Sequence, residues 1–193
     1  LCDYLRLARS SSNNVGSLSQ YRKPPSNRCH LSGIMRVLFS ENQQMEFTST
    51  GNNHHFDFWM VNGQTHWARL PPKTIQGFSC ELPICLQTGT ASWGKTHIER
   101  KHKHWLETQS KNVCELLYEK LGQPGHFFSS EESSKVKLVM RLAPDALLIL
   151  RHVENNILGD FLTVTTMYQV PRHIDGAGIG RYLSDYRTTN QIT

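Results

Sequence analysis

Alternating apolar and polar positions predict strands in the second half of the chain. From 136 to 142, apolar side chains alternate with Lys137 and Arg141, as expected of a strand with one buried face. Two further strands are predicted at 146–152 and at 161–170, the latter rich in Thr and Val. Short connections between these segments favour an antiparallel meander.

The first half of the chain shows shorter strand patterns between polar stretches. Leu1–Arg9 has helical spacing, and 10–32 is rich in Ser, Asn and Pro, which predicts a linker. The pair Asn62-Gly63 predicts a hairpin turn. Strands are expected at 33–39, 45–49, 56–61, 65–70 and 82–87. We expect 122–134 and the glycine-rich tail around 176–180 to be irregular.

The apolar period changes to that of a helix after residue 94. Thr96 and Glu99 fit a capping box, which predicts the helix start at Thr96. Ile98 and Trp105 share one stripe and should pack on a sheet built from 136–170. The helical pattern continues to Leu121, with a break expected near Ser110. The predicted fold class is therefore α+β, a helix packed on an antiparallel β-sheet meander.

The pattern also suggests two regions. Residues 1–80 are expected to form a mixed, partly irregular N-terminal region of strands and loops, whose role the sequence does not indicate. Residues 81–193 are expected to form the functional domain. The longest apolar run, Ala146–Leu150, is far too short to cross a bilayer, so no membrane segment is predicted.

Composition narrows the class of partner. Lys and Arg total 21 against 16 acidic residues, a net charge of +5, and there are 10 histidines. This balance favours polyanionic partners such as nucleic acid or an acidic protein. The 5 cysteines are odd in number and include no C-x-x-C pair, which argues against a zinc ribbon. The length of the chain argues against a disulfide scaffold.

The segment 93–105 concentrates the candidate chemistry. On a helix, His97, Lys101 and His104 form one stripe, and His102 falls on the neighbouring stripe with Ile98 and Trp105. His102 should therefore lie at the edge of the buried surface, where burial can tune its pKa. Metal-independent RNA cleavage needs a base, an acid and a cation. Two histidines and a lysine meet these needs near neutral pH.

Interpretations other than RNA cleavage remain open for the same residues. The segment could be a solvated basic helix face, and His97, His102 and His104 could instead ligate zinc, although residues at i and i+2 diverge on a helix. The segment Thr163–Tyr168 could hold a phosphate or stack on a base, or be an ordinary strand. The pair His54-His55 is assigned to a surface turn.

The segment Gly94–His102 resembles the G-x-x-H-I-x-x-R/K-H element of the barnase/EndoU/colicin/RelE-like toxin nucleases, including their phage-associated branch. The resemblance covers about 82–170, where a helix precedes antiparallel strands and a late Thr-rich strand ending in Tyr. It implies acid and base roles for His97 and His102. It also implies charge stabilisation by Lys101 or Lys137, and phosphate or base contacts from Thr165, Thr166 and Tyr168. The additional His104 leaves open which two of the three histidines react.

The sequence and the resemblance together predict a toxin domain that cleaves RNA, with transfer RNA among the candidate substrates. No cofactor is expected. The residues expected to bind the substrate are Lys95, Lys137, Arg141, Arg151 and His104. An acidic immunity protein is the expected partner, and a domain secreted or delivered from a larger protein would act in the cytoplasm of the target cell.

Two alternative functions remain. A non-catalytic RNA- or phosphate-binding module would use the basic helix only to neutralise phosphates. An ADP-ribosyltransferase-like toxin would need an R…S-T-S…E-x-E pattern. Thr48-Ser49-Thr50 is its nearest fragment, without a downstream E-x-E.

Overall fold

The computed structural model of the chain describes residues 45–51, 54–129, 135–140, 146–169 and 177–189. For 135–140 it describes the backbone alone. The helix predicted at 1–9, the strand predicted at 33–39 and the site candidate Arg141 lie outside the described residues.

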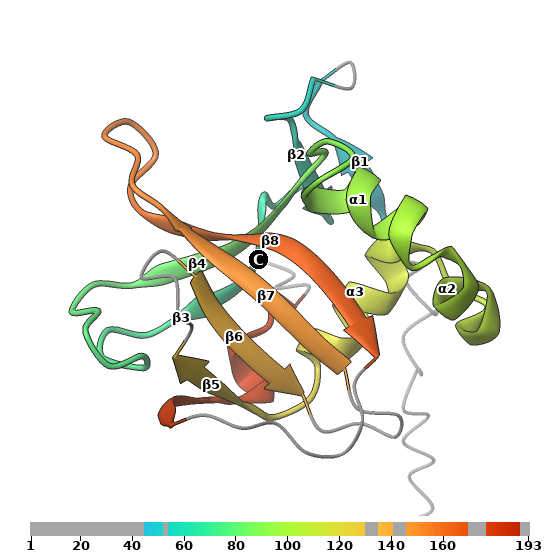
Figure 1. Cartoon of the computed structure of the whole chain (residues 1–193). Helices are drawn as coiled ribbons and strands as arrows, with labels where there is room; N and C mark the ends of the chain where they lie inside the picture. Colours follow the sequence, from blue (N-terminus) through green and yellow to red (C-terminus); the bar gives the residue numbers. More distant parts are fainter. Residues whose placement is uncertain (1–44, 52–53, 130–134, 141–145, 170–176, 190–193) are drawn as a thin grey trace, which may run out of the picture. The chain divides into compact units, whose positions relative to one another are not determined.

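One twisted sheet organises the described part of the chain (Figure 1). Its strands are β1 (Phe47–Ser49), β2 (Phe58–Val61), β3 (His66–Leu70), β4 (Leu82–Gln87), β5 (Gly125–Ser129), β6 (Lys135–Met140), β7 (Ala146–Val153), β8 (Phe161–Gln169) and β9 (Gly178–Tyr182). They follow the order β1-β2-β4-β8-β7-β6-β5-β9, and β3 pairs with β4. The α+β class predicted from the sequence is confirmed.

The sheet is mixed rather than wholly antiparallel. The strands β6 to β8 form the predicted meander, which β5 extends by one antiparallel strand, but β4 and β8 run parallel, with Ile84 opposite Leu162. A parallel neighbour needs a long crossover, and here the three helices and the meander strands separate β4 from β8. The alternation of apolar and polar residues within single strands does not predict this crossover.

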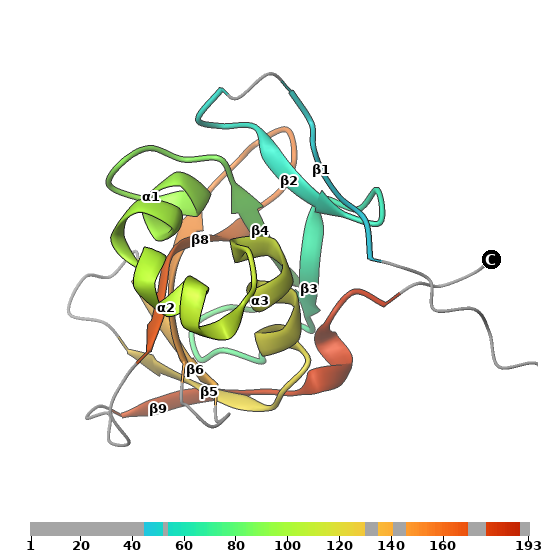
Figure 2. The ribbon, with the colours of Figure 1, turned by 90° about the vertical axis from the view of Figure 1, so that its right-hand side faces the viewer.

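Three helices follow β4: α1 (Gly94–Lys101), α2 (Lys103–Gln109) and α3 (Val113–Leu121). All three lie on one side of the sheet in Figure 2. Ile98 is fully buried and Trp105 almost so, and both join the core, as predicted. The largest fully buried side chains include Trp67, Phe127 and Tyr182. The core therefore lies between the helices and the sheet face they cover.

The helix boundaries differ from the prediction in two ways. The helix begins at Gly94 after Trp93, without a side-chain cap, so the box predicted at Thr96 is wrong. The real capping box starts α3, where Asn112 and Glu115 exchange hydrogen bonds. The helix also breaks at His102, in addition to the predicted break near Ser110, where α2 ends.

Two regions expected to be irregular are strands. β5 buries Phe127 completely, and β9 pairs with it in the antiparallel sense. Gly180 of β9 lies against Thr74, whose carbonyl oxygen would be 2.2 Å from a Cβ at that position. The glycines that suggested a loop thus allow one strand to pass close to another segment of backbone.

The first strands are not separate from the later ones. β1 pairs with β2, β2 pairs with β4, and β3 pairs with β4. Residues 47–70, which were assigned to an N-terminal region apart from 81–193, therefore share one sheet with it. None of the described helices is both long and apolar enough to cross a membrane.

A bulge in β8 decides which of its side chains share a face. Ile149 lies opposite Thr166, but the next residue of β7, Leu150, lies opposite Val164, so Thr165 is the extra residue. Thr163 and Thr166 therefore lie on one face, although strict alternation predicted opposite faces.

Candidate active site

A glycine-bounded loop delivers the chain from β4 into α1. Gly89 and Gly94 have φ of +68° and +78°, a region that favours glycine. A Cβ on Gly89 would lie 2.1 Å from the carbonyl oxygen of Trp93, and one on Gly94 would lie 2.8 Å from the Cα of Gly89. Only glycine therefore fits at either position, and the tight loop fixes where α1 starts.

His97 is oriented by this loop. Its Nδ1 lies 2.8 Å from the carbonyl oxygen of Ala91. A carbonyl oxygen can only accept a hydrogen bond, so Nδ1 carries the proton and donates it. In the neutral ring the lone pair is then on Nε2, the nitrogen available for proton transfer.

His102 lies at the junction of α1 and α2 and reaches β8. Its Nε2 is 3.2 Å from the hydroxyl oxygen of Thr166. Its ring stacks on Tyr168, with centroids 5.6 Å apart and planes 20° apart. The His97 and His102 rings approach edge to face, with centroids 5.9 Å apart. The structure thus brings together His97, His102, Thr166 and Tyr168, four of the residues predicted from the sequence.

The surroundings of His102 favour its neutral form. Burial lowers its pKa below the usual 6.5, and the nearby His97 and Lys101 lower it further. At pH 7 this imidazole is therefore neutral and can accept a proton.

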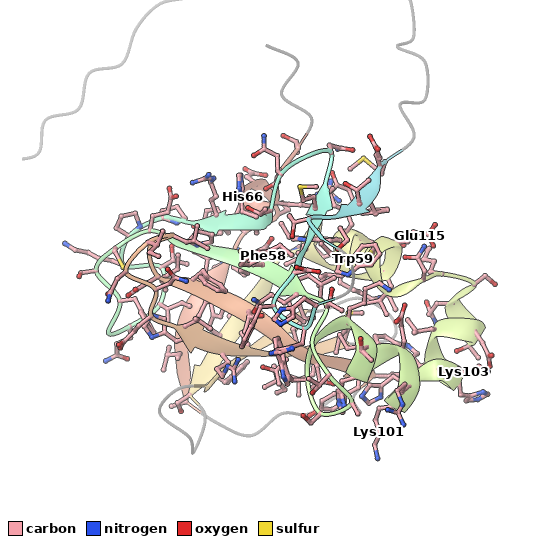
Figure 3. All side chains as sticks on the ribbon, turned by 90° about the horizontal axis from the view of Figure 1, so that it is seen from above. Phe58, Trp59, His66, Lys101, Lys103 and Glu115 are labelled. Atoms are coloured by element: carbon pink, nitrogen blue, oxygen red, sulfur yellow. The ribbon has the colours of Figure 1, made fainter. Side chains whose placement is uncertain are left out.

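The two lysines of α1 lie in different environments. Lys101 is exposed and projects outward from the helix (Figure 3). The Lys95 ammonium lies 2.5 Å from a carboxylate oxygen of Glu99 and 4.2 Å from the centroid of the Trp59 ring. Lys95 thus has partners within the fold. Lys101 is the lysine of α1 whose positive charge lowers the pKa of His102.

Arg151 reaches the same region from β7. It lies opposite Thr163, and its guanidinium carbon is 5.3 Å from the centroid of the Trp93 ring. Arg151 alternates with Ile149 along β7, so it shares the sheet face that carries Thr166. Lys137 is opposite Ile149 in the backbone register.

The remaining candidates are less closely grouped. His104 is exposed on α2. The hydroxyls of Thr163 and Thr165 are buried, and neither has a hydrogen-bond partner among the described residues. No three side chains of His, Cys, Asp or Glu within the described part of the chain are grouped as a metal site would require, and this includes the three histidines of 97–104.

Sequence reasoning missed the aromatic residues beside this site. Trp93 is the first residue of the segment 93–105 and Phe56 the first residue of the strand predicted at 56–61, and the sequence did not place either at the site. Phe56 is 57% exposed, and its ring centroid lies 6.2 Å from that of Trp93. An aromatic residue next to a turn of Gly, Asn and His was the available signal, but only the fold shows that the two rings are neighbours.

Comparison with known proteins gives no match: no family model, curated protein or solved structure is significantly similar to the chain. The resemblance to toxin nucleases therefore rests on the motif at Gly94–His102 and the strands that follow it.

Proposed function

We propose that the chain is a metal-independent endoribonuclease of the barnase/EndoU/colicin/RelE-like toxin class. The observation that carries the proposal is the convergence of His97 and His102 with Thr166 and Tyr168 of the C-terminal half of β8. A neutral histidine, a second imidazole held by a backbone carbonyl, and nearby cations are the groups that RNA cleavage without a metal requires.

The environments of the two histidines suggest their roles. The lowered pKa of His102 suits a base that takes the proton from a ribose 2′-hydroxyl. The 2′-oxygen attacks the phosphorus, and the bond to the 5′-oxygen breaks. His97 can donate a proton from Nε2 to that oxygen while Nδ1 remains bonded to Ala91. The products are a 2′,3′-cyclic phosphate and a 5′-hydroxyl.

The groups around the histidines would support the transition state. The Thr166 hydroxyl can donate to a phosphate oxygen, and Lys101 and Arg151 supply positive charge. In this proposal Tyr168 holds the His102 ring in place.

The test is cleavage of an end-labelled RNA in excess EDTA. Because acid and base catalysis each contribute about 10²–10⁴-fold, His97→Ala and His102→Ala should each lower kcat/KM by about that factor. His104→Ala is the matched control: His104 is exposed on α2, so kcat should stay near the wild-type value and any loss should appear in KM, as expected of a substrate-binding residue. RNA with a 2′-deoxy nucleotide at the cleavage position should stay intact.

Two results would overturn the proposal. A wild-type protein that binds RNA but never hydrolyses it would favour the non-catalytic binding module. Activity that disappears with EDTA and returns with zinc would favour a metal enzyme.

The same proposal implies a partner in the producing cell. An acidic immunity protein would cover His97, Lys101 and Arg151, because opposite charge speeds and orients such encounters. Expression of the domain should arrest growth, and co-expression of the acidic protein should restore it. The domain would be secreted or delivered from a larger protein and act in the target cytoplasm.

A further inference from the structure

Several aromatic side chains lie in a row on the surface beside His97 and His102. The His54 and His55 centroids are 4.2 Å apart, and those of His55 and Phe56 are 4.1 Å apart. Phe56 continues to Trp93 at 6.2 Å, and Trp93 continues to the Arg151 guanidinium at 5.3 Å. We call these five residues the aromatic row.

The row is held by the backbone that holds the active site. The Gly89 amide donates to the carbonyl of His55, and the Thr88 amide donates to the carbonyl of Asp57, both at 2.8 Å. The Gln87 side chain donates to the carbonyl of Phe56 at 3.2 Å. The turn that carries the rings is therefore fixed to the loop that orients His97.

Exposure and charge make the row a surface for ligands. Phe56 is 57% exposed, although a phenylalanine of a stable fold is usually buried. Arg151 adds a permanent cation at one end of the row. The carboxylate of Asp57, in the same turn, accepts a hydrogen bond from the His54 amide at 2.7 Å, so this acid already has a partner.

We propose that the aromatic row binds unpaired bases of single-stranded RNA next to the cleavage position. This rests on the proposed ribonuclease function and names its substrate class. Bases stack on aromatic rings and on guanidinium planes whatever their identity, and the adjacent cation attracts the backbone phosphates. In a duplex each base is already stacked and paired, so the row should select single strands.

The binding test uses fluorescence anisotropy with an eight-nucleotide RNA carrying 2′-O-methyl groups throughout, which cannot be cleaved. Phe56→Ala and Trp93→Ala should each raise Kd about tenfold, the usual effect of losing one stacked base. Trp93→Phe should recover most of the affinity, because a flat ring remains. Ile157→Ala is the matched control, since Ile157 is apolar and 93% exposed elsewhere on the surface. A hairpin duplex should bind more weakly than the single strand.

A cleavage assay separates this inference from the proposed function. Phe56→Ala should lower kcat/KM on a ten-nucleotide RNA but leave it unchanged on a dinucleotide too short to reach the row. Selective binding of single-stranded RNA without any hydrolysis would overturn the proposed ribonuclease function but support the proposed role of the aromatic row. Unchanged affinity in both alanine variants, or equal binding of duplex and single strand, would overturn the proposal that the aromatic row binds unpaired bases.

Discussion

The imidazole of His102 stacks on the phenol ring of Tyr168 while its Nε2 is 3.2 Å from the Thr166 hydroxyl. Both contacts come from one face of β8, because Thr166 and Tyr168 are two residues apart in a regular stretch of the strand. A ring held by its plane and by one nitrogen has little rotational freedom. The break between α1 and α2 therefore falls where a histidine is fixed against the sheet.

Removing either contact should lower activity without unfolding the protein. Thr166→Val keeps the shape but loses the hydroxyl, and Tyr168→Leu loses the flat ring. Since each change loosens the His102 ring, we expect kcat to fall about tenfold with little change in KM, because misorientation affects proton transfer more than binding. Tyr168→Phe keeps the ring and is the control. Steady-state kinetics with circular dichroism would check both points, and a full loss in Tyr168→Phe would mean that the phenol hydroxyl itself reacts.

The pH dependence of cleavage should report the surroundings of His102. Because its pKa lies below 6.5, the acid limb of kcat/KM should have its inflection below that value. Lys101→Gln removes a positive charge that lowers this pKa, so the inflection should move upward. Lys103→Gln is the matched control, since Lys103 is an exposed residue of α2 paired with Glu107. Equal profiles for both variants would show that His102 is not the titrating base.

The spacing of apolar residues predicted the helices and strands that bury one face in the core. It did not predict elements whose sequence is set by contact with backbone far away in the chain. Ile98 and Trp105 anchor the helices as their spacing indicated, and β7 and β8 lie where strands were expected. β9 was missed because its glycines are required by a neighbouring segment, Thr74, far away in the sequence.

The site was predicted in part for a similar reason. His97 and His102 lie close together in sequence, so one motif could indicate both. The face on which Thr163 lies depends on the bulge in β8, and the link from Phe56 to Trp93 depends on the fold. Neither the bulge nor this contact can be predicted from the alternation of apolar and polar residues nearby in the sequence.

The two glycines of the loop before α1 should be more sensitive than a glycine in open space. Gly89→Ala and Gly94→Ala would combine an unfavourable positive φ with a backbone clash. Gly77→Ala shares the positive φ, +91°, but its Cβ would meet nothing within 4 Å. Since the left-handed conformation alone costs about 1–2 kcal/mol, Gly77→Ala should lose about that much stability and the other two clearly more. Urea unfolding would measure the difference, and equal losses would contradict the tight loop.

Stability should fall as the solution is acidified through the range in which histidine titrates. Burial lowers the pKa of His102 and of His66, so between each folded pKa and the unfolded value of 6.5 the unfolded chain binds more protons. The free energy of unfolding then rises with pH in that window, and this contribution is lost as pH falls below it. Replacing both histidines by glutamine should therefore flatten the dependence of Tm on pH from 7.5 downward. His104→Gln, which changes an exposed histidine, should leave the slope as in the wild type. A slope that persists in the double variant would assign the acid sensitivity to other groups.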